Sequence, residues 1–560
     1  MRTEEIRQLL RQEEGQRLEF KSWSKFRESK HGFLRDPREQ AAAFANAKGG
    51  VILLGVEDDA PHGVHTVTGC TGYDVSLLER SIRDGTEPHL SVAIEEHALP
   101  GGVVLAVRVP AASVEIRTGE GKLLGRYGSD TRPLTSLEHV RLRVEREQLD
   151  ITSQAEPHAT LDDIDPVEVG RIRNTIRRQM PGTELVSLGD DALLTELGLI
   201  SDVAGSPRPT MCGILCAGTQ AALRRLYPQA EIAYLHYNGA GALDDQQDLE
   251  LPLLAALARI EEILSARRRV ADVRVGLFSI RVPDFPEDVV REALLNAMCH
   301  RDYTHCGRIV LRHNENRMVI ESPGGFPGTI TPANILHHPP HPRNPSLARL
   351  FQRLGYVERA GLGIDRMFRV LLGLGKAAPE FADHGDFVVV AFGGTRFDPT
   401  FAAFVAREEN AGRPLTADAL LILTQLRHHR QITAAEAARL CQAMPGRAAT
   451  LLADMHNQGH LERAGKGRGT YYRLARRVYD ALGASLAYYR DKGIDAARHR
   501  EMVLQLVRER GRVKCGEVME LCGLSRNQAS WLLRTLVAEG ALIRHGTRRW
   551  AHYELSSSNA

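Results

Sequence analysis

The chain has 560 residues, and its 43% hydrophobic and 25% charged residues are typical of a soluble protein with a sizeable core. At about 150 residues a domain, it has room for three or four domains. The longest apolar runs, such as 51–54, are far too short to span a membrane, and the charged N-terminus lacks the apolar stretch of a signal peptide, so we expect a cytoplasmic protein without a membrane partner. The net charge of +2 excludes a polycation, so any nucleic-acid-binding surface must be a local cluster of basic residues.

Residues 1–145 are expected to form an α/β domain. An alanine-rich stretch at 39–47 predicts a helix that ends at Gly49-Gly50, and the apolar stretches 51–56 and 102–109 predict buried strands. Five short motifs follow one another here: Glu14-Gly15, Glu19-Phe20-Lys21, Phe44-Ala45-Asn46-Ala47, Gly55-Val56-Glu57-Asp58 and Arg126-Tyr127-Gly128-Ser129. The ordered set resembles the Schlafen AlbA_2 domain over nearly the whole of residues 10–135.

The Schlafen resemblance implies nucleic-acid binding, and in some members of that family a carboxylate triad cleaves RNA. The residues that match the triad are Glu14, Glu19 and Glu57, with Asp58 as an alternative third acid. Three converging carboxylates could hold Mg²⁺ or Mn²⁺ and activate a water molecule. The expected nucleic-acid-binding residues of this domain are Lys21 and Arg126. A purely structural ion pair between Glu19 and Lys21 is the alternative.

A polar stretch at 146–165 predicts a linker, and residues 166–400 are expected to form a second α/β domain. Apolar residues at helical spacing predict helices at 166–180 and 251–269. Apolar runs predict strands at 232–237, 308–313, 317–321 and 387–392.

A candidate nucleotide site lies within this second region. Glu292, Asn296 and His300 are spaced by four and therefore share one helix face. A carboxylate there can orient a water molecule, and a carboxamide one turn away can ligate Mg²⁺. Glycine-rich loops follow at 322–328 and 361–363, where backbone N–H groups can approach phosphates.

The ordered set of motifs resembles the GHKL ATPase fold of gyrase, the Hsp90 chaperone, histidine kinases and MutL. It is closer to the divergent ATP-binding domain that follows Schlafen-like domains in many bacterial proteins named as transcriptional regulators. The resemblance implies ATP and Mg²⁺ as cofactors, with Glu292 as the catalytic acid and Asn296 as the metal ligand. The other implied nucleotide-binding residues are Gly324, Gly325, Arg343, Asn344, Gly361 and Gly363.

Two features depart from the GHKL pattern or compete with it. The adenine-binding Asp of that family is not at its usual place, and Glu321 or Ser322 stands near it. His337, His338 and His341 lie in a proline-rich loop, where a phosphate lid or a surface loop is favoured over a zinc site because no cysteine joins them.

An internal repeat occupies residues 416–555. Leu440-Cys441 recurs 81 positions later as Leu521-Cys522, and the same offset relates Leu451-Leu452 to Leu532-Leu533 without a gap. Each copy has three predicted helices followed by a hairpin with a basic tip. This order resembles the winged-helix family, so we expect winged-helix modules at 413–478 and 497–557.

The second copy has the sharper pattern for DNA binding. Ser525 is expected to cap its third helix, with Gln528 completing a capping box. Residues in the first turn of a recognition helix meet base edges, and basic residues in the wing meet phosphates. The residues expected to bind DNA are Arg526, Asn527, Arg544, Arg548 and Arg549 in this copy, and Arg447, Lys466 and Arg468 in the first.

The leading hypothesis is therefore a multidomain α/β and α+β protein that binds ATP, binds DNA or RNA, regulates transcription and forms a homo-oligomer. One alternative is a metal-dependent nuclease of the phage-defence type. Another is an interaction scaffold with an inactive ATP site. A binding role without cleavage and an ATPase activity both remain open at this point.

Overall fold

A computed structural model describes residues 3–24, 32–59, 63–146, 149–275, 278–357, 362–465, 467–483, 499–522, 524–546 and 551–556. The chain forms two compact units. The first comprises Met1–Arg269, Asp284–Ile364 and Pro379–Thr395, and the second comprises Val270–Pro283, Asp365–Ala378 and Arg396–Ala560. Within the described ranges, no helix is both long and apolar enough to cross a bilayer.

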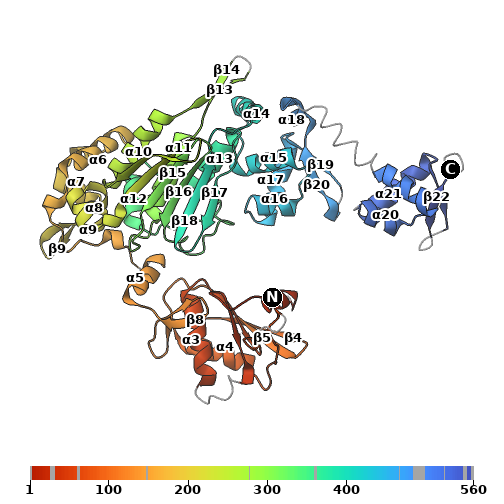
Figure 1. The fold of residues 1–560 in the computed structure, drawn as a ribbon, viewed down its shortest axis with the longest axis horizontal. Coiled ribbons are helices and arrows are strands. Elements are labelled where there is room, and N and C mark those ends of the chain that lie inside the picture. Colours follow the sequence, from red (N-terminus) through yellow and green to blue (C-terminus); the bar gives the residue numbers. More distant parts are fainter. Residues whose placement is uncertain are drawn as a thin grey trace. The chain divides into compact units, whose positions relative to one another are not determined.

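The N-terminal part of the first unit is built on a four-stranded sheet in the order β1-β2-β5-β4 (Figure 1). Its strands are β1 (Leu18–Lys21), β2 (Gly50–Leu54), β5 (Gly102–Val109) and β4 (Ala93–Leu99), and only β1 and β2 run parallel. Alternate residues of β2 and β5 enter two separate apolar cores, which explains their continuous hydrophobic runs. The first core lies under α3 (Gly32–Asn46) and α4 (Val75–Asp84), and the second involves α1 (Thr3–Leu9).

The predicted helix and strands of this part are confirmed. The helix ends where expected because Gly49 has a φ of +69°, and a side chain there would press on the backbone of Val109 and Ala111. A hairpin of β7 (Leu124–Tyr127) and β8 (Asp130–Pro133) precedes α5 (Ser136–Glu145). Two short paired strands, β3 (Thr86–Glu87) and β6 (Arg117–Thr118), complete this part.

The segment predicted to be a linker, 146–165, is instead folded onto the central part. Met211 N donates to Gln154 O at 2.9 Å, and Ser346 N donates to Asp150 Oδ2 at 2.8 Å. The backbone of Gln154 and the side chain of Asp150 therefore pair with backbone groups of neighbouring segments. It leads into four helices and a small hairpin: α6 (Pro166–Gln179), α7 (Asp190–Glu196), α8 (Met211–Ala217), α9 (Gln220–Leu226), β9 (Ile200–Val203) and β10 (Ser206–Pro209).

The central part is built on a six-stranded mixed sheet in the order β12-β11-β15-β16-β18-β17. Only β11 and β15 run parallel to each other. The strands are β11 (Ile232–Tyr237), β12 (Leu243–Leu249), β15 (Ile309–Asn314), β16 (Arg317–Pro323), β17 (Glu380–Asp383) and β18 (Phe387–Gly393). The four predicted strands are confirmed, and β12 and β17 are additional because their sequences are too polar or too short to be recognised.

The helices of the central part that matter for function are α10 (Leu253–Arg267), α11 (Glu287–His300), α12 (Pro345–Arg353) and α13 (Gly363–Gly373). Helix α11 packs against β16 and contacts α10 and α12. A β-ribbon of β13 (Val270–Val275) and β14 (Phe278–Pro283) belongs to the second unit.

The C-terminal part contains two segments with the same order of elements. After α14 (Pro399–Asn410), the first has α15 (Ala417–His428), α16 (Ala434–Leu440), α17 (Pro445–Asn457), β19 (Leu461–Ala464) and β20 (Tyr471–Leu474), followed by α18 (Arg476–Ala481). The second has a helix at 499–510, then α20 (Cys515–Cys522), α21 (Arg526–Ala538), β21 (Leu542–His545) and β22 (His552–Leu555). Helices α17 and α21 begin 81 positions apart, as do the two hairpins.

Candidate nucleotide and nucleic-acid sites

Helix α11 presents a row of polar side chains to a cleft because its apolar residues are buried on the opposite side. Asn296 Nδ2 donates a hydrogen bond to Glu292 Oε1 at 3.1 Å. His300, one turn further, also lines the cleft, and its Nδ1 is buried without a hydrogen-bond partner among the described residues. Burial, with the charges of Arg343 and His341, lowers the pKa of His300 to about 4, so its ring is neutral at physiological pH.

The cleft beside α11 is largely apolar. Its hydrophobic lining comes from β16, β17, β18 and the loop after β16: Ile320, Phe326, Ile330, Ile335, Phe381, Val388 and Val390. Such a lining suits the faces of a purine ring. The described lining residues include no lysine or arginine, so phosphate groups would have to be neutralised by a metal ion and by backbone N–H groups.

Gly363 closes one end of this cleft at the beginning of α13. A Cβ atom at this position would overlap the carboxylate of Glu292. The carboxylate therefore lies directly against the first turn of α13, where the helix dipole favours negative charge. Only glycine allows Glu292, Asn296 and the start of α13 to meet in this way; the neighbouring Gly361 lies outside the described residues.

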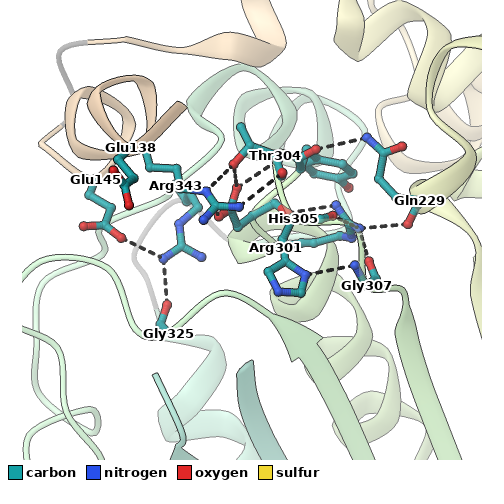
Figure 2. Close-up of polar contacts among 12 residues, drawn as sticks. Glu138, Glu145, Gln229, Arg301, Thr304, His305, Gly307, Gly325 and Arg343 are labelled. Atoms are coloured by element: carbon teal, nitrogen blue, oxygen red, sulfur yellow. Dashed lines mark hydrogen bonds and ion pairs between the residues drawn. The ribbon is translucent and has the colours of Figure 1, made fainter. Parts of the chain in front are cut away.

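The other predicted nucleotide-binding residues close the C-terminal end of α11 (Figure 2). Arg343 donates to His300 O and to Gly325 O, both at 2.7 Å, and lies 3.9 Å from Glu145. Asn344 Nδ2 donates to Cys299 O at 2.9 Å and to Arg301 O at 2.8 Å. Both side chains are buried, and neither lines the cleft.

The two glycines after β16 line the cleft and are also required by close packing. A Cβ at Gly324 would meet the Arg343 guanidinium, and one at Gly325 would lie 2.7 Å from Gly385 O. Of the two residues near the expected adenine-binding position, Ser322 lines the cleft and donates to Ala297 O at 3.0 Å. Glu321 instead forms an ion pair with Arg312.

Arg301 is a residue that sequence reasoning missed. Its buried side chain donates to Gln229 O at 2.8 Å and His305 O at 3.1 Å, and also to Gly307 O (Figure 2). It thereby fixes the loop that leaves α11. The polar run His300-Arg301-Asp302 at the end of the helix was the available signal.

The predicted acidic triad is only partly assembled. Glu19 is 2% exposed and forms ion pairs with Arg126 and, at 2.5 Å, with Lys21 Nζ. Glu14 Oε1 accepts from Phe20 N at 2.7 Å. Burial raises the pKa of Glu14; the Phe20 N–H lowers it, and the charges of Glu19 and Asp58 raise it further.

Glu57 is directed to another partner, since its carboxylate accepts a hydrogen bond from Ser22. The third acid that acts on Glu14 is therefore Asp58. Over the described ranges, no three His, Cys, Asp or Glu side chains come close enough to share a metal ion, and this includes the histidines of the proline-rich loop.

Comparisons with known families identify two of the parts described above. Residues 14–135 match the family model of the Schlafen AlbA_2 domain. Residues 307–392, from β15 into β18, match a HATPase-type model described as "Putative ATP-dependent DNA helicase recG C-terminal". The chain is a Schlafen-domain protein with an ATPase-like domain.

The intervening residues 142–233 match a domain of unknown function, which includes the segment predicted to be a linker. Among solved structures, the DIP2311 protein of Corynebacterium diphtheriae is 23% identical over 96% of this chain and 95% of its own, with a TM-score of 0.49. No curated protein matches the chain.

In the ATPase-like domain, the family match contains Gly324, Gly325, Arg343 and Asn344. It begins after α11 and therefore does not include Glu292 and Asn296, whose predicted roles rest on their spacing and on the geometry of the cleft. In the Schlafen domain, Arg126 is a buried structural residue that also donates to Gly15 O at 3.0 Å, so it is not presented to a ligand.

The basic residues predicted in the two C-terminal segments differ in their surroundings. Arg526, Asn527 and Arg544 are exposed, and the capping box of Ser525 and Gln528 is confirmed. Arg447, in contrast, lies 3.4 Å from Asp418 in an ion pair. The predicted wing residues Lys466, Arg548 and Arg549 and the side chain of Arg468 lie outside the described residues.

Proposed function

We propose that this Schlafen-domain protein is an ATP-dependent, DNA-binding regulator of transcription. ATP would bind in the cleft beside α11, and the Schlafen domain and the C-terminal segments would contact nucleic acid. The main support is the hydrogen-bonded pair of Glu292 and Asn296, one turn apart, at the edge of an apolar cleft that Gly363 closes.

The residues present fit a nucleotide with its metal ion. Because Asn296 Nδ2 donates to Glu292, its Oδ1 is the atom left for a Mg²⁺ ligand. Bound Mg²⁺ would neutralise the phosphates, which the described cleft residues cannot do by themselves. Glu292 would orient a water molecule and accept its proton, since its carboxylate is held by Asn296 and the first turn of α13.

Helix α13 offers a physical route from the cleft to the C-terminal part. It begins at Gly363 in the cleft, and its residues Asp365 and Arg369 line a second cleft with Arg447 and Asp454 of α17. A change in the position of the helix start on nucleotide binding would move these residues as well, because a helix of this length behaves as a rigid element.

Replacing Asn296 with alanine should abolish Mg²⁺-dependent nucleotide binding. At a ligand concentration about 100 times the dissociation constant, ATP should stabilise the wild type by roughly 2–3 kcal/mol, and the variant should gain nothing. Thermal unfolding with ATP or ADP, with Mg²⁺ or with EDTA, measures this. Glu292→Gln should retain the stabilisation and lose any hydrolysis. A wild type that neither nucleotide stabilises would refute the proposed ATP site.

Metal-dependent nuclease activity is the second candidate function, because the charges of Glu19 and Asp58 act on Glu14. The ion pairs of Glu19 with Lys21 and Arg126 favour a structural role, so we expect no cleavage of structured RNA or single-stranded DNA with Mg²⁺ or Mn²⁺. The assay compares the wild type with Glu19→Gln and with Glu57→Gln, the neighbouring acid held by Ser22. Metal-dependent cleavage lost only in Glu19→Gln would reverse this expectation.

A further inference from the structure

The exposed side of α21 carries an unusual set of side chains. Trp531 is 62% exposed, and Asn527 and Arg534 are exposed one turn before and after it. Spacings of four and three place these residues on one face of the helix, with Arg526 at its edge. The opposite face is buried through Ala529, Leu532, Leu533 and Leu536. An exposed indole between basic and amide groups has no role in the core of this segment.

The first copy of the repeat is an internal control for what the fold itself requires. The core positions of α17 keep small or apolar residues, since Ala448, Leu452 and Met455 correspond to Ala529, Leu533 and Leu536. The exposed positions do not: at the same offset α17 has Pro445, Gly446, Thr450 and Ala453 in place of Arg526, Asn527, Trp531 and Arg534. The module therefore folds without these four side chains.

The surroundings of α17 agree with this division. Its Arg447 is paired with Asp418, and Thr450 and Asp454 line the cleft that Asp365 and Arg369 share. This face of the first copy is exposed but lines a cleft within the second unit, carries an acidic residue, and has no exposed aromatic side chain. On α21 the described face carries two arginines and no acid between Arg526 and Ala538.

We propose that α21 is the nucleic-acid-contacting helix of the C-terminal part and that Trp531 stacks on an unpaired base of a single strand or of a single-stranded overhang. This rests on the proposed nucleic-acid function. Arginine guanidinium groups match phosphate oxygens, and the flat indole matches the face of any base. A purely duplex-reading helix gains most from hydrogen-bonding side chains at base edges, and here the centre of the face is Trp531 instead. Helix α17 does not contact nucleic acid.

The test is fluorescence anisotropy of the full-length chain with a labelled 20-nucleotide single strand, its blunt duplex, and the duplex with a single-stranded overhang. Trp531→Ala should weaken binding of the single strand and of the overhang duplex about tenfold or more. Trp531→Phe should keep most of the wild-type affinity, because a phenyl ring still stacks on a base. Arg534→Ala should reduce the slope of the logarithm of the binding constant against the logarithm of the salt concentration by about one unit, as expected for the loss of one phosphate contact. The matched control is Thr450→Ala in the first copy, which should change nothing.

Three results would count against the proposal in different ways. A wild type that binds none of the probes would refute the nucleic-acid function itself. Normal binding that Trp531→Ala leaves unchanged would overturn only the assignment of α21. Equal weakening on the blunt duplex and the single strand would overturn base stacking and identify the helix as a groove reader. The chain has three tryptophans, and Trp23 is only 3% exposed. Quenching of tryptophan fluorescence by the single strand that is lost in Trp531→Phe and retained in Trp550→Phe therefore supports stacking directly.

Discussion

Replacing Gly363 with alanine is expected to abolish nucleotide binding while leaving the chain folded. The added methyl group would overlap the carboxylate of Glu292, so the carboxylate must leave the first turn of α13 and lose its hydrogen bond with Asn296. Alanine favours helices more than glycine by about 1 kcal/mol, so α13 itself should not unfold. Stabilisation by Mg²⁺ and ATP in thermal unfolding, expected for the wild type, should disappear.

Gly373, at the other end of the same helix, provides the matched control. A Cβ there would lie 3.8 Å from Val405 Cγ1, which is an ordinary contact. Gly373→Ala should therefore bind nucleotide like the wild type. Normal nucleotide binding by Gly363→Ala would mean that the position of Glu292 against α13 is not needed, and the proposed site would lose its main geometric support.

Much of the fold could be predicted because local sequence patterns indicate its helices and strands. The strands β2 and β5 are continuous apolar runs with both faces buried, and the repeat is visible because its core positions recur at one offset. The strands β12 and β17 were missed because their apolar residues are few, and pairing at the edges of the sheet holds them. The segment at 146–165 was predicted to be a linker, and its packing was not foreseen because hydrogen bonds to distant backbone groups, rather than apolar spacing, hold it.

The candidate sites were predictable as positions but not as contacts. Helical spacing was sufficient to bring Glu292, Asn296 and His300 to one cleft. It could not reveal that Arg343 and Asn344 donate hydrogen bonds to carbonyl groups at the end of α11, because those partners are about 40 residues away in the sequence. Glu57 and Asp58 are consecutive, and only the three-dimensional structure distinguishes the one that faces Ser22 from the one that acts on Glu14.

The C-terminal segments illustrate a third limit. Arg447 was grouped with Arg526 because both lie early in a third helix, but in the register of the repeat Arg447 corresponds to Gln528. The third helices of the two copies can thus carry different side chains on the exposed face that could contact a ligand. The same comparison identifies side chains that the fold does not require, and this is how Trp531 stands out.

A large loss of stability is expected on replacing Glu408, a buried carboxylate whose hydrogen bonds link α14 to the first C-terminal segment. Glu408 lies in α14 and is 5% exposed. It accepts two hydrogen bonds from Arg413 at 2.9 and 3.1 Å, one from His460 at 2.8 Å and two from Arg477 at 3.1 and 3.4 Å. Burial alone would raise the pKa of this carboxyl, but the bonds from Arg413 and His460 and the charge of Arg477 outweigh it and hold the pKa at about 2.

Glu408→Ala should lower the free energy of unfolding of this segment by about 2–3 kcal/mol, because His460 stays buried while the two half-exposed arginines can turn toward solvent. A depressed folded-state pKa contributes stability that is complete above the unfolded value of 4.5 and is lost as the pH falls toward 2. The wild type should therefore lose stability in this segment over that interval, and Glu408→Ala should lose less. Hydrogen exchange of the amides of α14 and β19 across this pH range measures the stability of the segment. The control is Glu409→Ala, a change at the exposed neighbouring residue. An equal pH dependence in Glu408→Ala and Glu409→Ala would show that the cluster around Glu408 does not stabilise the segment.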